Sequence, residues 1–540
     1  MNTGTITPYR SAQRPGRDGF PQLVRSEWTK FRSVRGWVIA MAGTMLLTVL
    51  TVTLLAGTAN GGQNAAAGPT AAIGPGGEAV TDDFYFARQQ LHGNGSITAT
   101  VTSLTDVGQT PKGANPGIIQ PWAKAGIIIK ASTRPGSAYA AVLATPSHGV
   151  RMQYDYTHDI AGLAGAVSAG SPRWLRLARS GDTITGYDST DGRHWLEIGI
   201  ASLPGLPSTV QAGLVAASPS VPMSGQGFAS NNVGSLATTV TASFGHVSLT
   251  DTQPGSTWRA GQVGRATGPE PAPALNSPCP RKMPRGSFCI NGHPSLGVFA
   301  RSGGTFTVAE TDGDIAPYVA IVDPLGATLK GSLVGLIAII ALGALFITAE
   351  YRRRMIRTTF AASPRRGRVL AAKAVVIGSV TFVAGLIAAA IAVPIAEHKL
   401  QAGHWAPSVY PAWSLTSGHG VQLVVGTAAL LAVAAILAVS VGAVLRRSAG
   451  AITAVVVLIV LPLILATILP QTYADWILRL TPAAAFGLQQ GLPSYPQVSN
   501  TCLPYNGCFP LAPWTGFAVL CVWAAVALGI AIYLLRRRDA

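Results

Sequence analysis

Six apolar segments constrain this chain more than any other feature of its sequence. Each is long enough to cross the hydrocarbon core of a membrane, which takes about 20 predominantly apolar residues. None of them contains Asp, Glu, Lys, Arg or His. They run over residues 36–57, 331–349, 374–395, 421–445, 450–469 and 514–535. A single water-soluble globule is therefore excluded, and a multi-pass membrane protein with six spans is predicted.

The first apolar segment does not resemble a cleavable signal peptide. It begins after 35 residues, is too long for the apolar region of such a peptide, and is followed by no clear cleavage site with small residues. We expect residues 36–57 to remain as a membrane anchor.

Basic residues orient the predicted spans. Twenty of them fall in four stretches, whereas Lys399 and Arg479 alone lie in the two short loops on the other side. The four stretches are residues 1–35, 350–373, 446–447 and 536–538. The positive-inside rule therefore predicts a plasma-membrane protein with both termini in the cytoplasm.

The long segment between the first two spans, residues 58–330, should lie outside the cytoplasm. It carries 17 basic and 16 acidic residues, so it is nearly neutral, although the whole chain has a formal charge of +17. The excess charge is therefore a topology signal that also attracts anionic membrane lipid. Nucleic acid is not a predicted partner.

The composition of this outer segment changes along its length. Residues 58–81 are rich in Gly and Ala and read as a linker. Residues 82–251 contain short alternating runs separated by Gly, Pro, Asp and Ser, with tight turns at 180–182 and 190–192. This pattern predicts an antiparallel β-sandwich. Residues 252–330 read as a Pro-rich linker with a membrane-proximal segment. The predicted fold is thus six helical spans with an all-β sandwich inserted between spans one and two.

The sandwich carries four motifs that resemble a known fold. They are Asp83-Phe84-Tyr85-Phe86, Pro121-Trp122-Ala123-Lys124, Pro172-Arg173-Trp174-Leu175 and Gly186-Tyr187-Asp188-Ser189 followed by Trp195. Together they resemble the concanavalin A-like lectin/glucanase sandwich. The resemblance implies a glycan as a candidate ligand, with Trp122, Trp174 and Trp195 able to stack on sugar rings. Packing inside the fold is the commoner fate of tryptophan at strand positions.

Glycoside hydrolysis would require two carboxylates that converge on a cleft. Most acidic residues of the segment stand in turns, where Asp is favoured for its local hydrogen bonds to the backbone. No catalytic residues are therefore assigned, and an enzyme is not predicted.

Four of the five cysteines form two close pairs in predicted outer loops. Cys279 and Cys289 lie in the large outer segment, and Cys502 and Cys508 lie in the last outer loop. Disulfides are expected in an oxidising compartment. A zinc site is disfavoured because neither pair has the C-x-x-C spacing, so no metal is predicted.

The N-terminal arm ends in an amphipathic segment, residues 23–35. Val24, Trp28 and Phe31 fall on one helical face, with Lys30 and Arg32 among the basic residues around it. This pattern predicts an interfacial helix that leads into the first span.

A second informative segment follows span two. Apolar and aromatic residues alternate there with arginines, and the helix is expected to stop at Ser363 because the next residue is Pro364. The surface residues predicted to dock a soluble partner are Glu350, Tyr351, Arg352, Met355, Ile356, Arg357 and Phe360.

These two segments and the run 476–484 resemble permease subunits of type-2 ABC exporters from high-G+C bacteria. The resemblance covers residues 23–57 and 330–540. It implies an elbow helix at 23–35, a coupling helix at about 350–363 on an ATP-binding subunit, and a short outer re-entrant segment near 473–481. It further implies a dimer with a second permease copy or homologue.

The energy source can be argued from the residues themselves. The chain has no G-x-x-x-x-G-K-[ST] motif to hold ATP phosphates, and its spans lack the ionisable groups that proton or sodium coupling needs. A transporter therefore requires ATP and magnesium on a partner ATPase, with no cofactor on this chain. The alternatives are a membrane-anchored glycan sensor or adhesin, and a membrane-tethered hydrolase. Six spans without an output domain disfavour the sensor.

Overall fold

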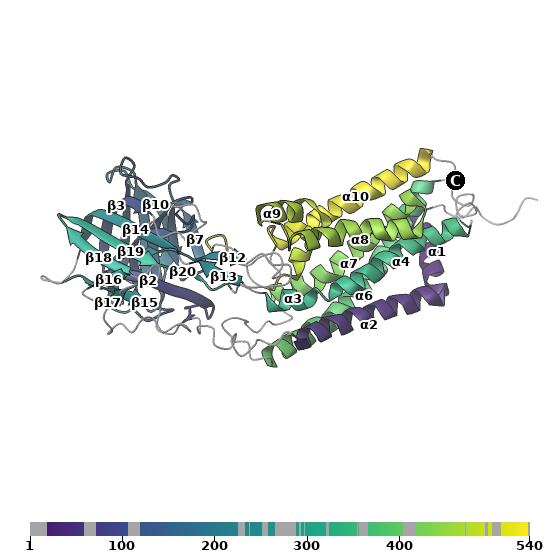
Figure 1. The fold of residues 1–540 in the computed structure, drawn as a ribbon, viewed down its shortest axis with the longest axis horizontal. Helices are drawn as coiled ribbons and strands as arrows, with labels where there is room; N and C mark the ends of the chain where they lie inside the picture. The colour runs from purple at the N-terminus through teal and green to yellow at the C-terminus, as the bar shows by residue number, and fades with distance from the viewer. Residues whose placement is uncertain are drawn as a thin grey trace, which may run out of the picture.

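The computed structural model of this protein describes most of the chain. The described residues are 19–58, 72–105, 119–224, 233–236, 238–250, 257–264, 288–290, 293–295, 297–319, 323–353, 355, 365–402, 417–469, 471–491, 495–498 and 509–537. Strands lie between α2 (Arg35–Thr58) and α3 (Pro324–Leu329), and helices lie before and after them (Figure 1).

Six helices in the described residues are long and apolar enough to span a membrane, which confirms the predicted number. The spanning stretches are Arg35–Gly57, Leu325–Arg352, Arg366–Gln401, Gly418–Leu445, Ser448–Leu465 and Pro513–Arg537. The helices are α1 (Phe20–Ser33), α2 (Arg35–Thr58), α3 (Pro324–Leu329), α4 (Ser332–Arg352), α6 (Arg366–Ala402), α7 (Gly418–Leu445), α8 (Ser448–Leu465), α9 (Gln471–Leu480), the 3₁₀ helix η1 (Pro482–Gln489) and α10 (Pro513–Arg537).

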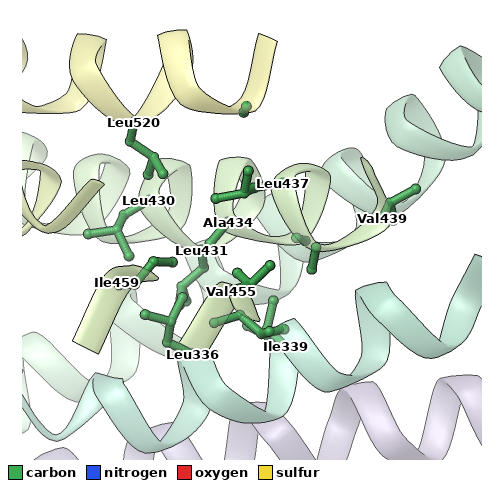
Figure 2. Close-up of a cluster of buried hydrophobic side chains, with 14 of the residues drawn as sticks. Leu336, Ile339, Leu430, Leu431, Ala434, Leu437, Val439, Val455, Ile459 and Leu520 are labelled. Carbon is green, nitrogen blue, oxygen red and sulfur yellow. The ribbon is translucent and has the colours of Figure 1, made fainter. Parts of the chain in front are cut away.

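Helix α7 forms the centre of the helical bundle. Its most apolar window is 67% buried, against 22% for α2, α8 and α10. Leu430, Leu431 and Leu437 of α7 pack with side chains of α4, α8 and α10 (Figure 2). The partly exposed helices α2, α8 and α10 therefore offer their apolar outer faces to lipid or to another protein.

Small residues allow α4 to lie close to α2. A Cβ built on Gly335 would meet the Thr48 side chain at 1.9 Å. One turn away, the Thr51 hydroxyl donates to the Gly331 carbonyl over 2.7 Å. Close backbone approach at small residues is typical of helix packing in membranes.

The segment before the last span contains two short helices. The amphipathic helix α9 is followed by η1, which is buried along its whole length. The sequence resemblance implied a short re-entrant segment near 473–481, and α9 covers these positions except Thr481.

The strands form two large antiparallel sheets and two small ones. The nine-stranded sheet has the order β1-β2-β11-β4-β5-β6-β7, with β15 and β20 also paired to β2. The seven-stranded sheet has the order β10-β9-β8-β3-β14-β19-β18. The strands are β1 (Ala72–Ile73), β2 (Ala79–His92), β3 (Gly95–Thr105), β4 (Lys124–Lys130), β5 (Tyr139–Thr145), β6 (Gly149–Tyr154), β7 (His158–Ala161), β8 (Arg173–Ser180), β9 (Thr183–Ser189), β10 (Leu196–Ser202), β11 (Thr209–Ala217), β12 (Val221–Ser224), β13 (Val233–Leu236), β14 (Thr239–Leu249), β15 (Arg259–Val263), β16 (Phe288–Ile290), β17 (His293–Ser295), β18 (Gly297–Ser302), β19 (Thr305–Thr311) and β20 (Asp314–Pro317).

The two large sheets share one hydrophobic core, and we call them together the two-sheet region. Ile127 and Ile129 of β4 meet Leu175 and Leu177 of β8 in this core. The predicted turn at 180–182 joins β8 to β9, with Ser180 opposite Thr183. Gly181 has φ +62° there, a conformation that glycine adopts without steric cost.

The sheets extend beyond the predicted bounds of 82–251. Strand β2 begins at Ala79, and β15, β18, β19 and β20 pair into the two sheets after residue 251. The segment 252–330 is thus not only linker and membrane-proximal chain, since part of it completes both sheets.

The two-sheet region lies at one end of the helical bundle, beyond α3 and α9 (Figure 1). Helix α1 and the end of α10 lie at the opposite end (Figure 1). The turn at 495–498 contacts the two-sheet region, because the Gln497 amide donates to the Tyr156 carbonyl over 3.2 Å. Gln497 itself is buried.

Candidate functional site

Helix α1 packs against the bundle at the end far from the two-sheet region. Pro21 stands in its first turn, where a missing N–H costs nothing. The helix ends where Val34 becomes extended, directly before α2. Of the predicted apolar face, Phe31 is 5% exposed and packs edge-on against Phe346 of α4, with ring centroids 6.3 Å apart. Trp28, by contrast, is 47% exposed.

An unpredicted acidic residue takes part in the burial of α1. Glu27 is 2% exposed, and its carboxylate lies 2.6 Å from the Lys373 ammonium near the start of α6. The same ammonium lies 2.6 Å from the Glu350 carboxylate near the end of α4. Lys30 closes the group, 2.7 Å from Glu27 and 3.6 Å from Glu350. We call Glu27, Lys30, Glu350 and Lys373 the charge cluster.

The charge cluster is formally neutral, with two carboxylates and two ammonium groups. The Lys373 side chain has no exposed surface, so its charge depends on these partners and on the Phe346 ring, whose centroid lies 5.0 Å from the Nζ. Burial lowers the pKa of Lys30, but the hydrogen bond and charge of Glu27 more than offset this effect, so the pKa lies above its usual value. The Lys30 ammonium therefore keeps its charge beside the two carboxylates.

The charge cluster joins three parts of the chain. Glu27 and Lys30 belong to α1, Glu350 to the last turn of α4, and Lys373 to the early part of α6. The predicted docking segment lies between α4 and α6. Glu350 before this segment and Lys373 after it therefore both belong to the charge cluster, which also holds α1 in place.

The predicted docking residues differ in how far they are exposed at the surface. Glu350 points into the charge cluster and is not available as a surface contact. Tyr351 is half-buried, with the Arg446 guanidinium carbon 5.3 Å from its ring centroid. Arg352 and Met355 are exposed. Ile356, Arg357 and Phe360 lie outside the described residues.

Sequence reasoning missed Glu27 and Lys373 as members of a site. A signal did exist, because Glu27 is the only acidic residue between Gly19 and Gly77, and Glu350 is the only one between Pro324 and Ala396. Lone carboxylates in strongly basic flanks indicate specific ion pairs. Nothing local identifies the shared partner, however, since Lys373 is 346 positions from Glu27.

Two cavities flank the end of α4. The elbow cavity, of about 700 Å³, lies between the α1–α2 junction (Lys30 to Ala40) and the last turns of α4 (Leu342 to Arg353). The arginine cavity, of about 490 Å³, lies on another side of α4 and is lined by Arg352, Arg446 and Arg447.

The three tryptophans suggested for sugar stacking each have a partner within the protein. Trp122 stacks on His148 with ring centroids 3.8 Å apart. Trp174 lies 4.8 Å from the His246 ring, and the Arg176 guanidinium lies 4.0 Å above the Trp195 ring. Contact of these residues with a glycan stays a prediction.

The cysteine pairs also stay predictions. Cys279, Cys502 and Cys508 lie outside the described residues, and Cys289 is described only as a backbone position of β16. Cys521 on α10 is a free thiol. Among the described residues, no group of His, Cys, Asp and Glu could hold a metal ion.

Comparison with known proteins gives one family match. Residues 206–540 match the model of a family described as "ABC-2 family transporter protein", which covers more than half of the chain. No curated protein matches.

Solved structures resemble part of the chain only weakly. A scytalido-glutamic peptidase with a transition state analog inhibitor is 9% identical, with a TM-score of 0.24, over 43% of this chain and 98% of its own. A functionally unknown protein from Saccharomyces cerevisiae is 14% identical, with a TM-score of 0.21, over 35% of this chain and 84% of its own.

Proposed function

The chain belongs to the ABC-2 family of transporter proteins, and from this premise we propose that it is the membrane-spanning permease subunit of an ATP-driven exporter. ATP and magnesium would bind a separate ATPase subunit, because the sequence lacks a phosphate-binding loop. A second permease copy or a homologue would complete the assembly. The transported substrate is not part of the proposal.

We further propose that α1 and the end of α10 face the cytoplasm and that the two-sheet region lies outside, as a concanavalin-like module between the first two spans. The distribution of basic residues supports this orientation. So does the position of the two-sheet region at the end of the bundle away from α1 (Figure 1).

The charge cluster is the observation that carries the proposed mechanism. A soluble ATPase that presses on the segment between α4 and α6 would act on both flanks of that segment. Glu350 and Lys373 lie on these flanks and are bonded to each other over 2.6 Å, so α4 and α6 would move as a unit. Glu27 would bring α1 along with them.

The motion would then reach the centre of the bundle. Both α4 and α6 pack directly against α7, and α4 approaches α7 closely at a small residue, as it does α2. A Cβ built on Gly343 of α4 would meet the Ala435 carbonyl at 2.8 Å. Interiors packed this tightly transmit displacement instead of absorbing it.

Since Glu350 faces inward, the docking surface for the ATPase consists of the residues that follow it. Arg352 and Arg353 are exposed at the end of α4, and Met355 is exposed just after it. The predicted contacts at Ile356, Arg357 and Phe360 continue from there. Apolar anchors would supply most of the contact energy, and the arginines would orient the ATPase.

Purification of the tagged full chain from its own membranes tests the proposed function. An ATP-binding subunit should co-purify, and the reconstituted permease should stimulate its ATP hydrolysis. A chain that purifies free of any ATP-binding subunit, and stimulates none encoded in the same cell, would contradict the proposal.

Labelling with a membrane-impermeant maleimide tests the orientation separately. Thr190→Cys in the two-sheet region should react in intact cells, and Arg32→Cys on α1 should react only after the membrane is opened. The reverse pattern would invert the proposed topology.

A further inference from the structure

The elbow cavity has the shape and polarity of a site for an amphipathic ligand. It is about 700 Å³ in volume, within the range of roughly 300–1,000 Å³ that is usual for small-molecule sites. Its lining on α4 and its C-cap runs from Leu342 to Arg353, which corresponds to roughly 17 Å along a helix axis. The cavity is therefore elongated along the spans.

Its two ends differ in character. Ala40, Leu342 and Leu345 line the part furthest inside the spans, and all three are apolar. Trp37 and Phe346 continue the wall and pack edge-on with ring centroids 5.6 Å apart. This part suits an acyl chain.

Basic side chains lie where the spans end. Lys30 lines the cavity from α1, and Arg353 lines it from the end of α4. Lys30 is 44% exposed, and Arg353 is exposed. Glu350 is the lining acid, but it is already paired with Lys373 over 2.6 Å. Lys30 is likewise paired, 2.7 Å from Glu27, and the charge cluster as a whole is neutral. The net positive charge at the mouth therefore comes from Arg353, with the partly exposed Lys30 ammonium as a second donor to a phosphate.

From this arrangement we propose that the elbow cavity binds one phospholipid with an anionic headgroup, with the headgroup phosphate between Lys30 and Arg353 and an acyl chain against Trp37, Phe346 and Leu342. Basic pockets between membrane helices are known to hold anionic lipid headgroups. The position of the cavity at the ends of α2 and α4 places it at the depth where such headgroups lie. The site does not depend on transport, so it can be present even if the proposed function fails.

The lipid would also lie against the charge cluster, because Lys30 and Glu350 belong to both. A bound headgroup would keep Lys30 at the mouth and leave Lys373 to hold the two carboxylates. The site would thereby connect membrane composition with the attachment of α1.

Photo-crosslinking tests the proposal on the purified full chain. The chain is reconstituted in phosphatidylcholine vesicles that contain a little phosphatidylglycerol with a photoactivatable acyl chain, and adducts are mapped by mass spectrometry. Adducts should concentrate in residues 33–40 and 342–353. A phosphatidylcholine carrying the same photoactivatable group should label these residues less.

Two variants and a matched control make the test specific. Arg353→Gln should reduce labelling at these residues about fivefold, which corresponds to the roughly 1 kcal/mol that one basic residue contributes near an anionic surface. Gly36→Leu should also reduce labelling by filling part of the lipid site, because Gly36 lines the cavity and a Cβ added there has no atom within 4 Å to oppose it. Arg352→Gln, the same change on the neighbouring residue that lines the arginine cavity, should leave labelling unchanged.

Several outcomes would overturn the proposal. Equal labelling by the two lipids would show that the headgroup is not recognised. Displacement of the lipid by inorganic phosphate at low concentration would identify a free-anion site instead. Labelling spread evenly over the outer faces of the helices, unaffected by Arg353→Gln and Gly36→Leu, would show ordinary boundary lipid.

Discussion

Removal of the Lys373 ammonium should detach α1 from the bundle. Lys373→Met keeps a similar side-chain length but leaves the carboxylates of Glu27 and Glu350 buried with one partly exposed lysine between them. Lys373 has no exposed surface, and each carboxylate lies 2.6 Å away. Breaking a buried ion pair by removing one partner costs about 3–5 kcal/mol. Even about 3 kcal/mol raises the detached population of α1 roughly 100-fold.

Hydrogen–deuterium exchange of the full chain measures this effect directly. Amides of α1, Phe20–Ser33, should exchange faster in Lys373→Met, while those in the centre of α7 should not change. Lys399→Met is the matched control, since Lys399 is an exposed lysine at the other end of α6 whose ammonium donates to the Thr53 carbonyl over 3.1 Å.

Replacing three members of the charge cluster by neutral residues distinguishes two causes of detachment. One is the loss of the ion pairs, and the other is the cost of burying carboxylates that have lost their partner. The triple variant Glu27→Gln, Glu350→Gln and Lys373→Met should protect α1 better than Lys373→Met alone, because no unpaired charge remains buried. Parental protection of α1 in Lys373→Met would refute the assignment of the charge cluster as the attachment of α1. Equal loss in the single and triple variants would show that lost attraction, and not the unpaired buried charge, detaches α1.

Three further predictions concern the part outside the helical bundle. Non-reducing mass spectrometry of protein from intact cells should find two disulfides, and four free thiols would reject the pairing Cys279–Cys289 and Cys502–Cys508. The segment 72–319 expressed alone should fold, with the far-ultraviolet circular dichroism of an antiparallel β protein; a disordered spectrum would contradict a self-contained two-sheet region. His194 should titrate above its usual pKa because it is hydrogen-bonded to Asp191. The ion pair with Asp191 therefore contributes to stability below about pH 6.5, and this contribution is lost as the pH rises through the folded pKa. NMR can follow the titration, and a normal pKa for His194 would show that the ion pair does not form.

The spans and many of the strands could be predicted because their signals are local. Hydropathy identifies a span within its own window. The hairpin of β8 and β9 follows from alternation on both sides of Ser180-Gly181-Asp182. Neither signal depends on a distant part of the chain.

The edges of the two-sheet region are harder to predict from the sequence, because the strands there pair with strands that are distant along the chain. Strand β19 pairs with β14, and β20 pairs with Val80 to Asp83 of β2. The sequence of β19 alternates weakly, but this alternation does not show that its residues join a sheet that begins more than two hundred positions earlier. Pairing over such separations has no local signature.

The charge cluster could not be predicted for the same reason, because its members are distant from one another along the chain. Apolar spacing predicted a face of α1 with Val24, Trp28 and Phe31, and the structure buries Phe31 with Glu27 while Trp28 stays half-exposed. An amphipathic pattern ranks residues by polarity, so it places a carboxylate outside. The Lys373 ammonium reverses this ranking, and it lies on another helix.

In the mechanism that we propose, the segment after α4 couples the permease to an ATPase. Replacing Met355, Ile356 and Phe360 together by Ala removes the apolar anchors predicted there and spares Tyr351, which packs against the bundle. Each large anchor is worth roughly 1.5–3 kcal/mol by buried area. The spans and their basic flanks are unchanged, so insertion into the membrane should persist.

Permease-stimulated ATP hydrolysis, measured together with co-purification of the ATPase, is the most direct measurement. The triple variant should insert as the parent does, lose the bound ATPase and no longer stimulate hydrolysis. Arg479→Ala, a basic residue on α9 at the other end of the bundle (Figure 1), should leave both unchanged. If the triple variant still binds the ATPase and stimulates it as the parent does, this segment is not the coupling element and the proposed mechanism is contradicted.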